Sequence, residues 1–319
     1  MDEPLVSIIT VTYNLIKSNR KESFLRAVDS VKKQKYLKVE HIIVDGGSDD
    51  GTLDLIKNTG LNYISEPDNG IYDAMTKGIK LASGEYIFFL NSDDYLFDNS
   101  VVATIVNAFK ENDCEAICGN IVPYLLCNQE RNTHLFKIGE PNRGNPLLYK
   151  NKLFLIIDNI HHQSMFYKKK LFIDSSFFNE DFPNGSDWLF NCMTFLQYNN
   201  DYLYIDKNIA YFGLGGFSTN ATDDELLEEY LNMREIMQAR FGKYIDKTNK
   251  YYIKYIEKNK LKKIIYRIKN ISIVQKLSKY IKICNILNLS KYIAKIKWGN
   301  KCINTLSINQ AYKVMKKNI

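Results

Sequence analysis

The chain has 319 residues and 45% of them are hydrophobic, so it is long enough for one large α/β domain with a packed core and an appendage. No stretch reaches the roughly eighteen consecutive apolar residues that a membrane-spanning helix needs, and the acidic start Met1-Asp2-Glu3-Pro4 is unlike a secretory signal. The six cysteines form no CxxC pair and no metal-ligand spacing with the four histidines, which argues against a disulfide framework or a zinc site. We therefore expect a cytoplasmic protein with reduced thiols.

The net charge of +7 is distributed unevenly along the chain. From Lys243 to Ile319 there are 20 Lys and Arg but only two acids, whereas acids outnumber basic residues before that point. This asymmetry predicts an acidic folded domain over residues 1–242 and a basic segment with its own partner over residues 243–319. A general enrichment in Lys would not explain why acids become rare only in the second part.

Short apolar runs alternate with amphipathic stretches through the first hundred residues. In chain order, these stretches predict a strand at Leu5–Val11, a helix at Lys21–Gln34, a strand at Val39–Val44, a helix at Thr52–Asn58, a strand at Asn62–Ile64, a helix at Ile71–Ala82 and a strand at Tyr86–Leu90. This alternation is typical of βαβ units around a parallel sheet. Ligands of such sheets bind beyond the carboxyl ends of the strands, so we expect the loops after the four strands to converge.

The pattern becomes mixed after residue 100. It predicts a helix near Val101–Lys110, a strand at Ala116–Val122, a short apolar segment at Met165–Tyr167, a helix beginning near Asp187, a strand around Ile209–Phe212 and a helix from Asp224 to Phe241. Beyond Lys243, apolar and basic residues recur at helical spacing and Gly and Pro are almost absent. We expect this part to form about two or three amphipathic helices.

Two adjacent acids, Asp93 and Asp94, follow the predicted strand Tyr86–Leu90. Neighbouring carboxylates at the end of a buried strand repel each other, and burial is unfavourable unless a cation lies between them and a ligand. Mg²⁺ and Mn²⁺ are commonly bound through one or two carboxylates and completed by a diphosphate. Taken alone, an Asp-Asp pair at this place is more typical of an ordinary turn.

Two further acidic turns follow neighbouring strands, DGGSDDGT from Asp45 and SEPDNGIYDAMTKG from Ser65. Their glycines allow the backbone to approach a ligand closely. Helix capping by Ser48, Asp50 or Asp68 explains part of this composition. Three acidic loops at one edge of a sheet nevertheless need a cation or a hydrogen-bonding sugar to offset their charge.

Four motifs follow one another along the chain: VTYN from Val11, VDGGSDDGT, SEPDNGIYDAMTKGI and ASGEYIFFLNSDD. In this order and spacing, they make the chain resemble family 2 glycosyltransferases over roughly residues 4–220. The resemblance implies an α/β GT-A fold, a Rossmann-like, mostly parallel sheet flanked by helices, with a donor-binding half at 1–120 and an acceptor half at 121–242. It also implies an inverting hexosyltransferase that uses a nucleotide-sugar, in the first instance a UDP-sugar, and a divalent Mn²⁺ or Mg²⁺.

The resemblance assigns donor contacts residue by residue. These residues are Thr12, Tyr13, Asn14, Asp45, Ser48, Asp68, Asp73, Lys77, Asn91, Ser92 and Asp93. Tyr13 and Asp45 look like base-binding residues, and Asp73 and Lys77 look like residues on the diphosphate side.

The metal would bind at Asp93 and Asp94. The family pattern has an acid at the position of Asn91, so the first acid of the Asp-x-Asp motif is missing here. Both Asp93 and Asp94 therefore remain candidates for the main ligand.

Three segments of the second half, HHQSMFY from His161, FNEDF from Phe178 and SDWLF from Ser186, resemble the part of the family that holds the catalytic base. The acid that opens the helix is the base in that pattern, which is Asp187 here; a capping role is the alternative. A carboxylate so placed takes the proton of the acceptor hydroxyl while other groups neutralise the departing diphosphate. The remaining acceptor-side candidates are Glu180, Asp181, His162, Trp188, Gly216 and Ser218.

Two of these candidates have competing interpretations. His162 would orient an acceptor or a phosphate, or else would be a hydrogen-bonded core residue. Gly216 and Ser218 belong to a glycine-containing loop that would close over donor and acceptor, or else would form a simple turn.

The implied acceptor is a saccharide or a lipid-linked saccharide, as in the synthesis of capsule, lipopolysaccharide or another surface polysaccharide. The basic tail at 243–319 would suit the inner face of an anionic membrane, or a contact between copies of the chain, or a solvated extension. No nucleic-acid-binding motif accompanies its charge.

Two other functions stay open. A sugar nucleotidylyltransferase should have a Gly-rich, Arg-containing loop after the first strand, and Thr12–Leu15 contains neither Gly nor Arg. A membrane-associated scaffold of the same fold without activity is the other alternative.

Overall fold

The computed structural model describes residues 3–125, 139–142, 152, 155, 159–174, 185–214, 236–237 and 239–241. The predicted tail at 243–319, the acids Glu180 and Asp181, the loop residues Gly216 and Ser218, and most of the predicted helix Asp224–Phe241 lie outside the described residues. No helix in the described ranges has the length and apolar character needed to cross a membrane.

The described strands form one mixed sheet of eight, in the order β3-β2-β1-β4-β7-β6-β8-β5. The four parallel strands at one end are β1 (Val6–Thr12), β2 (Val39–Asp45), β3 (Asn62–Ser65) and β4 (Tyr86–Phe89). The other four are β5 (Tyr95–Leu96), β6 (Ala116–Leu125), β7 (Met165–Lys168) and β8 (Tyr202–Leu214). β7 runs antiparallel between β4 and β6, β8 is parallel to β6, and β5 is antiparallel to β8.

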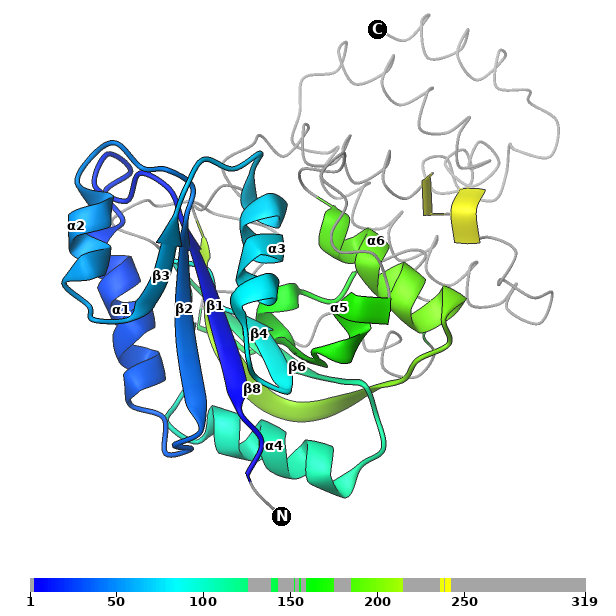
Figure 1. Ribbon diagram of the computed structural model, residues 1–319. Helices are drawn as coiled ribbons and strands as arrows, with labels where there is room; N and C mark the ends of the chain where they lie inside the picture. Colours follow the sequence, from blue (N-terminus) through cyan, green and yellow to red (C-terminus); the bar gives the residue numbers. More distant parts are fainter. Residues whose placement is uncertain are drawn as a thin grey trace, which may run out of the picture. The chain divides into compact units, whose positions relative to one another are not determined.

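Helices cover both faces of this sheet (Figure 1). They are α1 (Lys21–Lys32), α2 (Thr52–Lys57), α3 (Ile71–Leu81), α4 (Val101–Glu111), α5 (Lys170–Asp174) and α6 (Ser186–Cys192). A 3₁₀ turn at His162–Ser164 precedes β7, and a π-helical turn at Met193–Gln197 follows α6.

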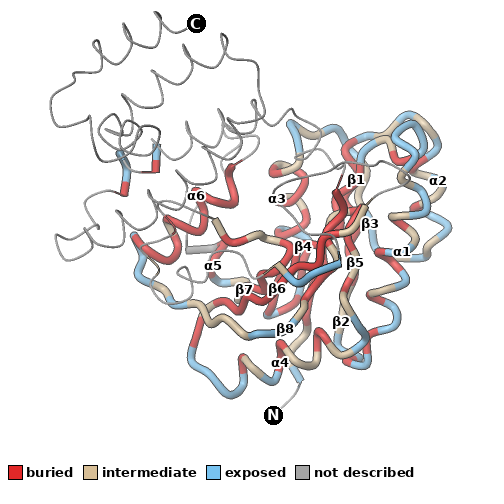
Figure 2. Tube along the Cα trace, turned by 180° about the vertical axis from the view of Figure 1, so that it is seen from behind, coloured by how far each residue is buried: buried red, intermediate tan, exposed pale blue. Residues whose placement is uncertain are grey.

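The central strands are buried on both faces, as their almost wholly apolar sequences predict (Figure 2). Because side chains alternate along a strand, Ile8 and Ile9 face opposite sides of the sheet. Ile8 belongs to a core cluster with α1 and α4, whereas Ile9 and Val44 lie against Gly78 of α3. A side chain at Gly78 would collide with Ile9, so this glycine lets α3 lie close to the sheet.

The predicted α/β fold and mostly parallel sheet are confirmed, and so are the predicted strands and helices through β4. The prediction missed the short elements β5 and α5, the antiparallel direction of β7 and the early start of β8 at Tyr202. These features depend on pairing between distant segments, which hydrophobic periodicity does not report.

Candidate active site

The loops after β1 and β2 are bound to each other, as the predicted convergence requires. The backbone N–H of Asn14 donates to Ser48 Oγ over 2.8 Å, and the Asn14 side chain accepts from the backbone N–H of Asp49 over 3.1 Å. The next residue, Leu15, donates its N–H to Thr52 Oγ1 over 2.8 Å. Tyr13, at the start of this loop, keeps 63% of its surface exposed and is accessible to a ligand.

Asp45, at the end of β2, is fully buried and holds three strands together. Its carboxylate accepts hydrogen bonds from Thr12 Oγ1 (3.2 Å), from Ser65 Oγ (2.7 Å), and from both the backbone N–H (3.0 Å) and the hydroxyl of Ser48. The ends of β1, β2 and β3 therefore meet at one carboxylate. The structure therefore shows this predicted base-binding residue joining the strand ends.

The loop after β3 completes this side of the site. Asp68 lies against Gly46, where a Cβ would collide with its carboxylate, so Gly46 permits the contact between the two loops. Burial raises the pKa of Asp68, and the nearby carboxylates of Asp73 and Asp45 raise it further. This concentration of negative charge was the basis for predicting a cation or sugar here.

Lys77 of α3 is a cation in contact with this loop. Its Nζ lies 2.7 Å from the carbonyl oxygen of Pro67, 3.1 Å from Glu66 Oε1 and 3.5 Å from Asp73 Oδ2. Burial alone would lower the pKa of Lys77, but the two carboxylates outweigh it and the pKa is raised. Lys77 therefore stays positively charged beside the predicted diphosphate position.

The acid pair after β4 is buried and incompletely satisfied. Asp94 Oδ1 accepts the backbone N–H of Gly213 over 2.8 Å, whereas Asp94 Oδ2 is buried with no hydrogen-bond partner among the described residues. Asp93 lies 3.6 Å from the Arg20 guanidinium, and its carbonyl oxygen accepts from the Tyr124 hydroxyl. Burial raises the pKa of Asp93, although the charge of Arg20 opposes this, and burial together with the Asp93 carboxylate raises the pKa of Asp94 well above its usual range.

These features fit a divalent cation, since an unpaired buried carboxylate oxygen and two adjacent acids are both stabilised by one. Among the described residues no group of three or more His, Cys, Asp and Glu is arranged to hold a metal. A cation at Asp93 and Asp94 would therefore depend on ligand oxygens to complete its coordination.

Asp187 lies in the first turn of α6 and is buried. Its carboxylate accepts hydrogen bonds from the Tyr72 hydroxyl (2.9 Å), from Asn159 Nδ2 (2.9 Å) and from His162 Nδ1 (3.2 Å). The N-cap of α6 is Gly185, so the capping alternative does not describe Asp187. Burial by itself would raise the pKa of Asp187, but the hydrogen bond and charge of His162 and the bond from Tyr72 outweigh it and hold the pKa below its ordinary value. Asp187 is therefore an ionised carboxylate in a buried setting.

His162 links this carboxylate to the loop after β4, because its Nε2 lies 3.4 Å from Asn91 Nδ2. Asn91 opens the segment that continues into Ser92 and the acid pair, so this contact joins His162 to that segment. Trp188 lies elsewhere: it is buried, and its indole N–H donates to the carbonyl oxygen of Leu155, so the structure places its side chain in the interior.

Sequence analysis missed Arg20, Tyr72 and Asn159. Tyr72 lies next to Asp73 in the segment that resembles the family, and this position was the sequence feature that could have indicated it. Nothing local marks Arg20 or Asn159, because their partners Asp93 and Asp187 lie far along the chain.

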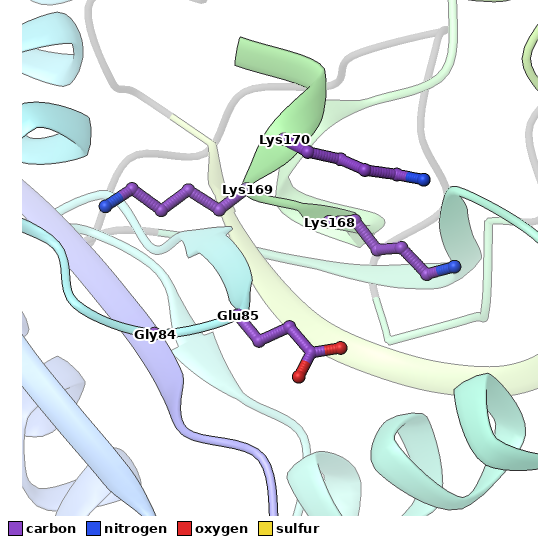
Figure 3. A pocket seen from close by; sticks show the side chains of 5 residues that line it. All are labelled: Gly84, Glu85, Lys168, Lys169 and Lys170. Atoms are coloured by element: carbon purple, nitrogen blue, oxygen red, sulfur yellow. The ribbon is translucent and has the colours of Figure 1, made fainter. Parts of the chain in front are cut away.

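A separate pocket lies at the opposite end of β4 (Figure 3). It is lined by Gly84, Glu85, Lys168, Lys169 and Lys170. Lys168 and Lys170 lie 3.6 and 2.8 Å from the Glu115 carboxylate, and Lys169 donates to a backbone carbonyl. Two of its lysines are thus paired with Glu115, and it is not part of the site around Asp187.

Comparison with known proteins identifies the family. Residues 7–174 match the family model described as glycosyl transferase family 2. The chain belongs to glycosyl transferase family 2. A PGL/p-HBAD biosynthesis glycosyltransferase of Mycobacterium bovis is 31% identical over 251 residues, which cover 76% of this family 2 chain and 88% of the relative. An uncharacterized glycosyltransferase of Rickettsia typhi is 26% identical over 251 residues, which cover 77% and 73% of the two chains.

Solved structures of S. aureus TarS share the fold of this glycosyltransferase. The TarS 1–349 complex with UDP-GlcNAc has a TM-score of 0.53 at 20% identity, covering 73% of this chain and 66% of that one. The complex with UDP has a TM-score of 0.51 at 21% identity and covers 73% and 65%. These likenesses confirm the GT-A fold, and the family match favours a glycosyltransferase over a nucleotidylyltransferase or an inactive scaffold.

Proposed function

We propose that this glycosyltransferase moves a hexose-type sugar from a nucleoside diphosphate donor to a hydroxyl of a saccharide or lipid-linked saccharide, with inversion at the anomeric carbon. The observation that carries the proposal is the ionised, buried Asp187, joined through His162 to the loop that bears Asp93 and Asp94. The Oδ2 atom of Asp94 has no hydrogen-bond partner among the described residues. TarS, which shares the fold, has been crystallised with UDP and with UDP-GlcNAc, so UDP-sugars are the first donors to test. A surface polysaccharide, capsule or lipopolysaccharide is the proposed product class.

The donor side is proposed to use residues from all four loops. The exposed ring of Tyr13 offers a face for the nucleotide base, and Asp45 fixes the loops beneath it. Lys77 supplies positive charge on the diphosphate side, and Asp73 positions its ammonium group.

Asp94, with Asp93, would hold Mn²⁺ or Mg²⁺, because Asp94 Oδ2 is a buried oxygen that no described residue contacts by a hydrogen bond. When bound, such an ion would offset the negative charge of the departing diphosphate. In its absence, burial together with the neighbouring Asp93 carboxylate accounts for the raised pKa of Asp94.

On the acceptor side, Asp187 is the proposed base that takes the proton of the acceptor hydroxyl. A direct displacement needs no nucleophilic residue from the enzyme, because the acceptor oxygen itself attacks the anomeric carbon.

A thermal-shift experiment with a panel of nucleoside diphosphates, with and without Mn²⁺, tests the donor and metal assignments together. UDP with Mn²⁺ should raise the melting temperature of the wild type and of the control Asp54→Ala, whose exposed carboxylate lies on α2. Asp94→Ala should lose the Mn²⁺-dependent part of the shift. No stabilisation of the wild type by any nucleoside diphosphate would refute the proposed function.

A turnover assay separates an enzyme from an inactive scaffold. The wild type should release nucleoside diphosphate from its donor, and Asp187→Ala should reduce this release by about 100-fold or more. Equal release by the two proteins would exclude Asp187 from the reaction.

We also propose that the basic segment 243–319 attaches the enzyme to an anionic membrane surface at the cytoplasmic face, because 20 Lys and Arg there face only two acids. The full chain should sediment with vesicles that contain phosphatidylglycerol and remain in solution with pure phosphatidylcholine. Binding to neither vesicle type, or salt-independent binding to both, would contradict this attachment. A change of molecular mass with protein concentration in the absence of vesicles would favour self-association instead.

A further inference from the structure

Asn159 holds two side chains of the same helix, α6. Its Nδ2 donates to Asp187 Oδ2 over 2.9 Å, and its Oδ1 accepts from Asn191 Nδ2 over 2.9 Å. Asp187 and Asn191 are four positions apart, so their side chains lie on one face of the helix. Asn159 therefore bridges this face of α6 from the segment before the 3₁₀ turn at His162–Ser164.

These contacts continue to β7. The Tyr167 hydroxyl donates to Asn191 Oδ1 over 3.2 Å, and both residues are fully buried. At the other end of the series, 11% of the Asp187 side chain is exposed. We call the series of three hydrogen bonds from Tyr167 through Asn191 and Asn159 to Asp187 the asparagine network. It connects the buried sheet to a carboxylate that solvent or a ligand can reach.

The polarity of the asparagine network is fixed by the ionised carboxylate. An ionised carboxylate only accepts hydrogen bonds, so Asn159 must present its NH₂ group to Asp187. The Asn159 oxygen then faces Asn191, which must present its own NH₂ group, and the Asn191 oxygen is left to accept from Tyr167. Reversing either amide would place an oxygen against an oxygen. The network is therefore satisfied in one arrangement of both amides.

This arrangement also holds the carboxylate of Asp187 in one orientation. Tyr72 donates to Oδ1, whereas Asn159 donates to Oδ2, so rotation of the carboxylate would break hydrogen bonds at both oxygens. Asn159 is itself bound to α6 through Asn191, and so keeps its place relative to the helix that carries Asp187. Such control matters for a base, because a catalytic group must lie within about 0.5 Å of its productive position.

We propose that Asn159 is a positioning residue for the Asp187 base, and that Asn191 acts through Asn159. The inference rests on the transferase function proposed above, in which Asp187 takes the proton of the acceptor hydroxyl. Neither asparagine exchanges a proton with the substrate. Their role is to keep the Asp187 carboxylate directed at the acceptor oxygen while that oxygen attacks the anomeric carbon.

Steady-state kinetics of full-length variants test this role, with release of UDP from a UDP-sugar as the readout. Asn159→Asp keeps the size of the side chain and an oxygen for Asn191, but it removes the amide donor that faces Asp187. It should lower kcat by about 100-fold, while the KM for the UDP-sugar stays within about 3-fold of the wild type. Asn191→Ala should lower kcat by about 10-fold, because Asn159 keeps its bond to Asp187 but loses its own anchor.

A double variant and a matched control separate positioning from a general loss of stability. If Asn191 acts through Asn159, Asn159→Ala/Asn191→Ala should have the kcat of Asn159→Ala within about 3-fold. The control Asn120→Ala truncates another buried asparagine, which accepts from Tyr204 over 2.7 Å and donates to Asp206 over 3.0 Å. It should lower the melting temperature, as Asn191→Ala does, and keep kcat within about 3-fold of the wild type.

The proposal is overturned by an Asn159→Asp enzyme whose kcat is within about 3-fold of the wild type, or by losses of kcat that multiply in the double variant. Equal losses in Asn191→Ala and Asn120→Ala would overturn it as well, since both would then reflect stability alone. If the Asn159 variants do not fold, Asn191→Ala decides, and a kcat near the wild type in this variant overturns the proposal. A wild type that neither binds UDP nor releases it would instead refute the proposed function.

Discussion

The hydrogen bond from Tyr72 to Asp187 predicts a measurable coupling between α3 and α6. It joins residues 115 positions apart over 2.9 Å, and both partners are buried. Hydrogen bonds to charged groups contribute about 1.5–3 kcal/mol to stability, whereas neutral pairs contribute about 0.5–1.5 kcal/mol. The pair formed by Tyr167 and Asn191 is a matched neutral control, because its hydroxyl also reaches α6, over 3.2 Å.

Two double-mutant cycles measure these couplings from the free energy of unfolding in urea. One combines Tyr72→Phe with Asp187→Ala, and the other combines Tyr167→Phe with Asn191→Ala. We expect about 1.5–3 kcal/mol for the first cycle and about 0.5–1.5 kcal/mol for the second. Equal couplings would show that Asp187 is not ionised in the folded protein.

The pH dependence of the first coupling is a second check. The pKa of Asp187 is held below its ordinary value, so the ionised pair contributes its stability at neutral pH. This contribution should persist down to about pH 4 and decline as the pH falls further, toward the lowered pKa. A coupling that is lost already at about pH 5.5 would refute an ionised Asp187 with a lowered pKa.

Three more predictions concern the framework of the site. Burial lowers the pKa of His41 to about 3, so below about pH 6.5 the unfolded chain binds a proton that the folded chain excludes. Between about pH 7.5 and 5, the free energy of unfolding should therefore fall by about 2 kcal/mol more in the wild type than in His41→Gln. Equal falls of the two proteins in urea titrations would contradict this. Gly78→Ala should lower the free energy of unfolding by about 1–3 kcal/mol, because the added methyl group collides with Ile9. Thermal unfolding should show a smaller loss when Gly78→Ala is combined with Ile9→Ala. Strictly additive losses would rule out the collision. Asp45→Asn should lower the free energy of unfolding by about 2 kcal/mol or more, because the hydroxyls of Thr12, Ser48 and Ser65 lose a charged acceptor. A change below about 0.5 kcal/mol in urea unfolding would show that stability does not depend on this carboxylate.

The first hundred residues could be predicted closely because their elements are local. Val6–Thr12 and Tyr86–Phe89 are apolar runs, and Lys21–Lys32 carries its apolar side chains at helical spacing, so neighbouring residues alone indicate strand or helix. The parallel sheet then follows from the alternation of these elements. The convergence of the acidic loops follows as well, since parallel strands end at one edge.

The partners of the site residues could not be predicted in the same way. Asp187 was recognised as an acid at the start of a helix, but its donors come from α3, from Asn159 and from the 3₁₀ turn before β7. Asp45 was expected at the nucleotide base, and the structure shows it accepting bonds from the ends of three strands. Both results depend on which segments lie together.

By itself, then, the sequence determined the succession of strands and helices, the acidic character of the sheet's ligand edge and the membership in glycosyl transferase family 2. Only the tertiary structure decided that β7 enters the sheet in reverse beside β4 and that His162 thereby lies between Asn91 and Asp187. The physical reason is the distance along the chain over which each property is set. Hydrophobic periodicity depends on residues a few positions apart, whereas the ionisation of a buried carboxylate depends on hydrogen bonds to segments that only folding brings near.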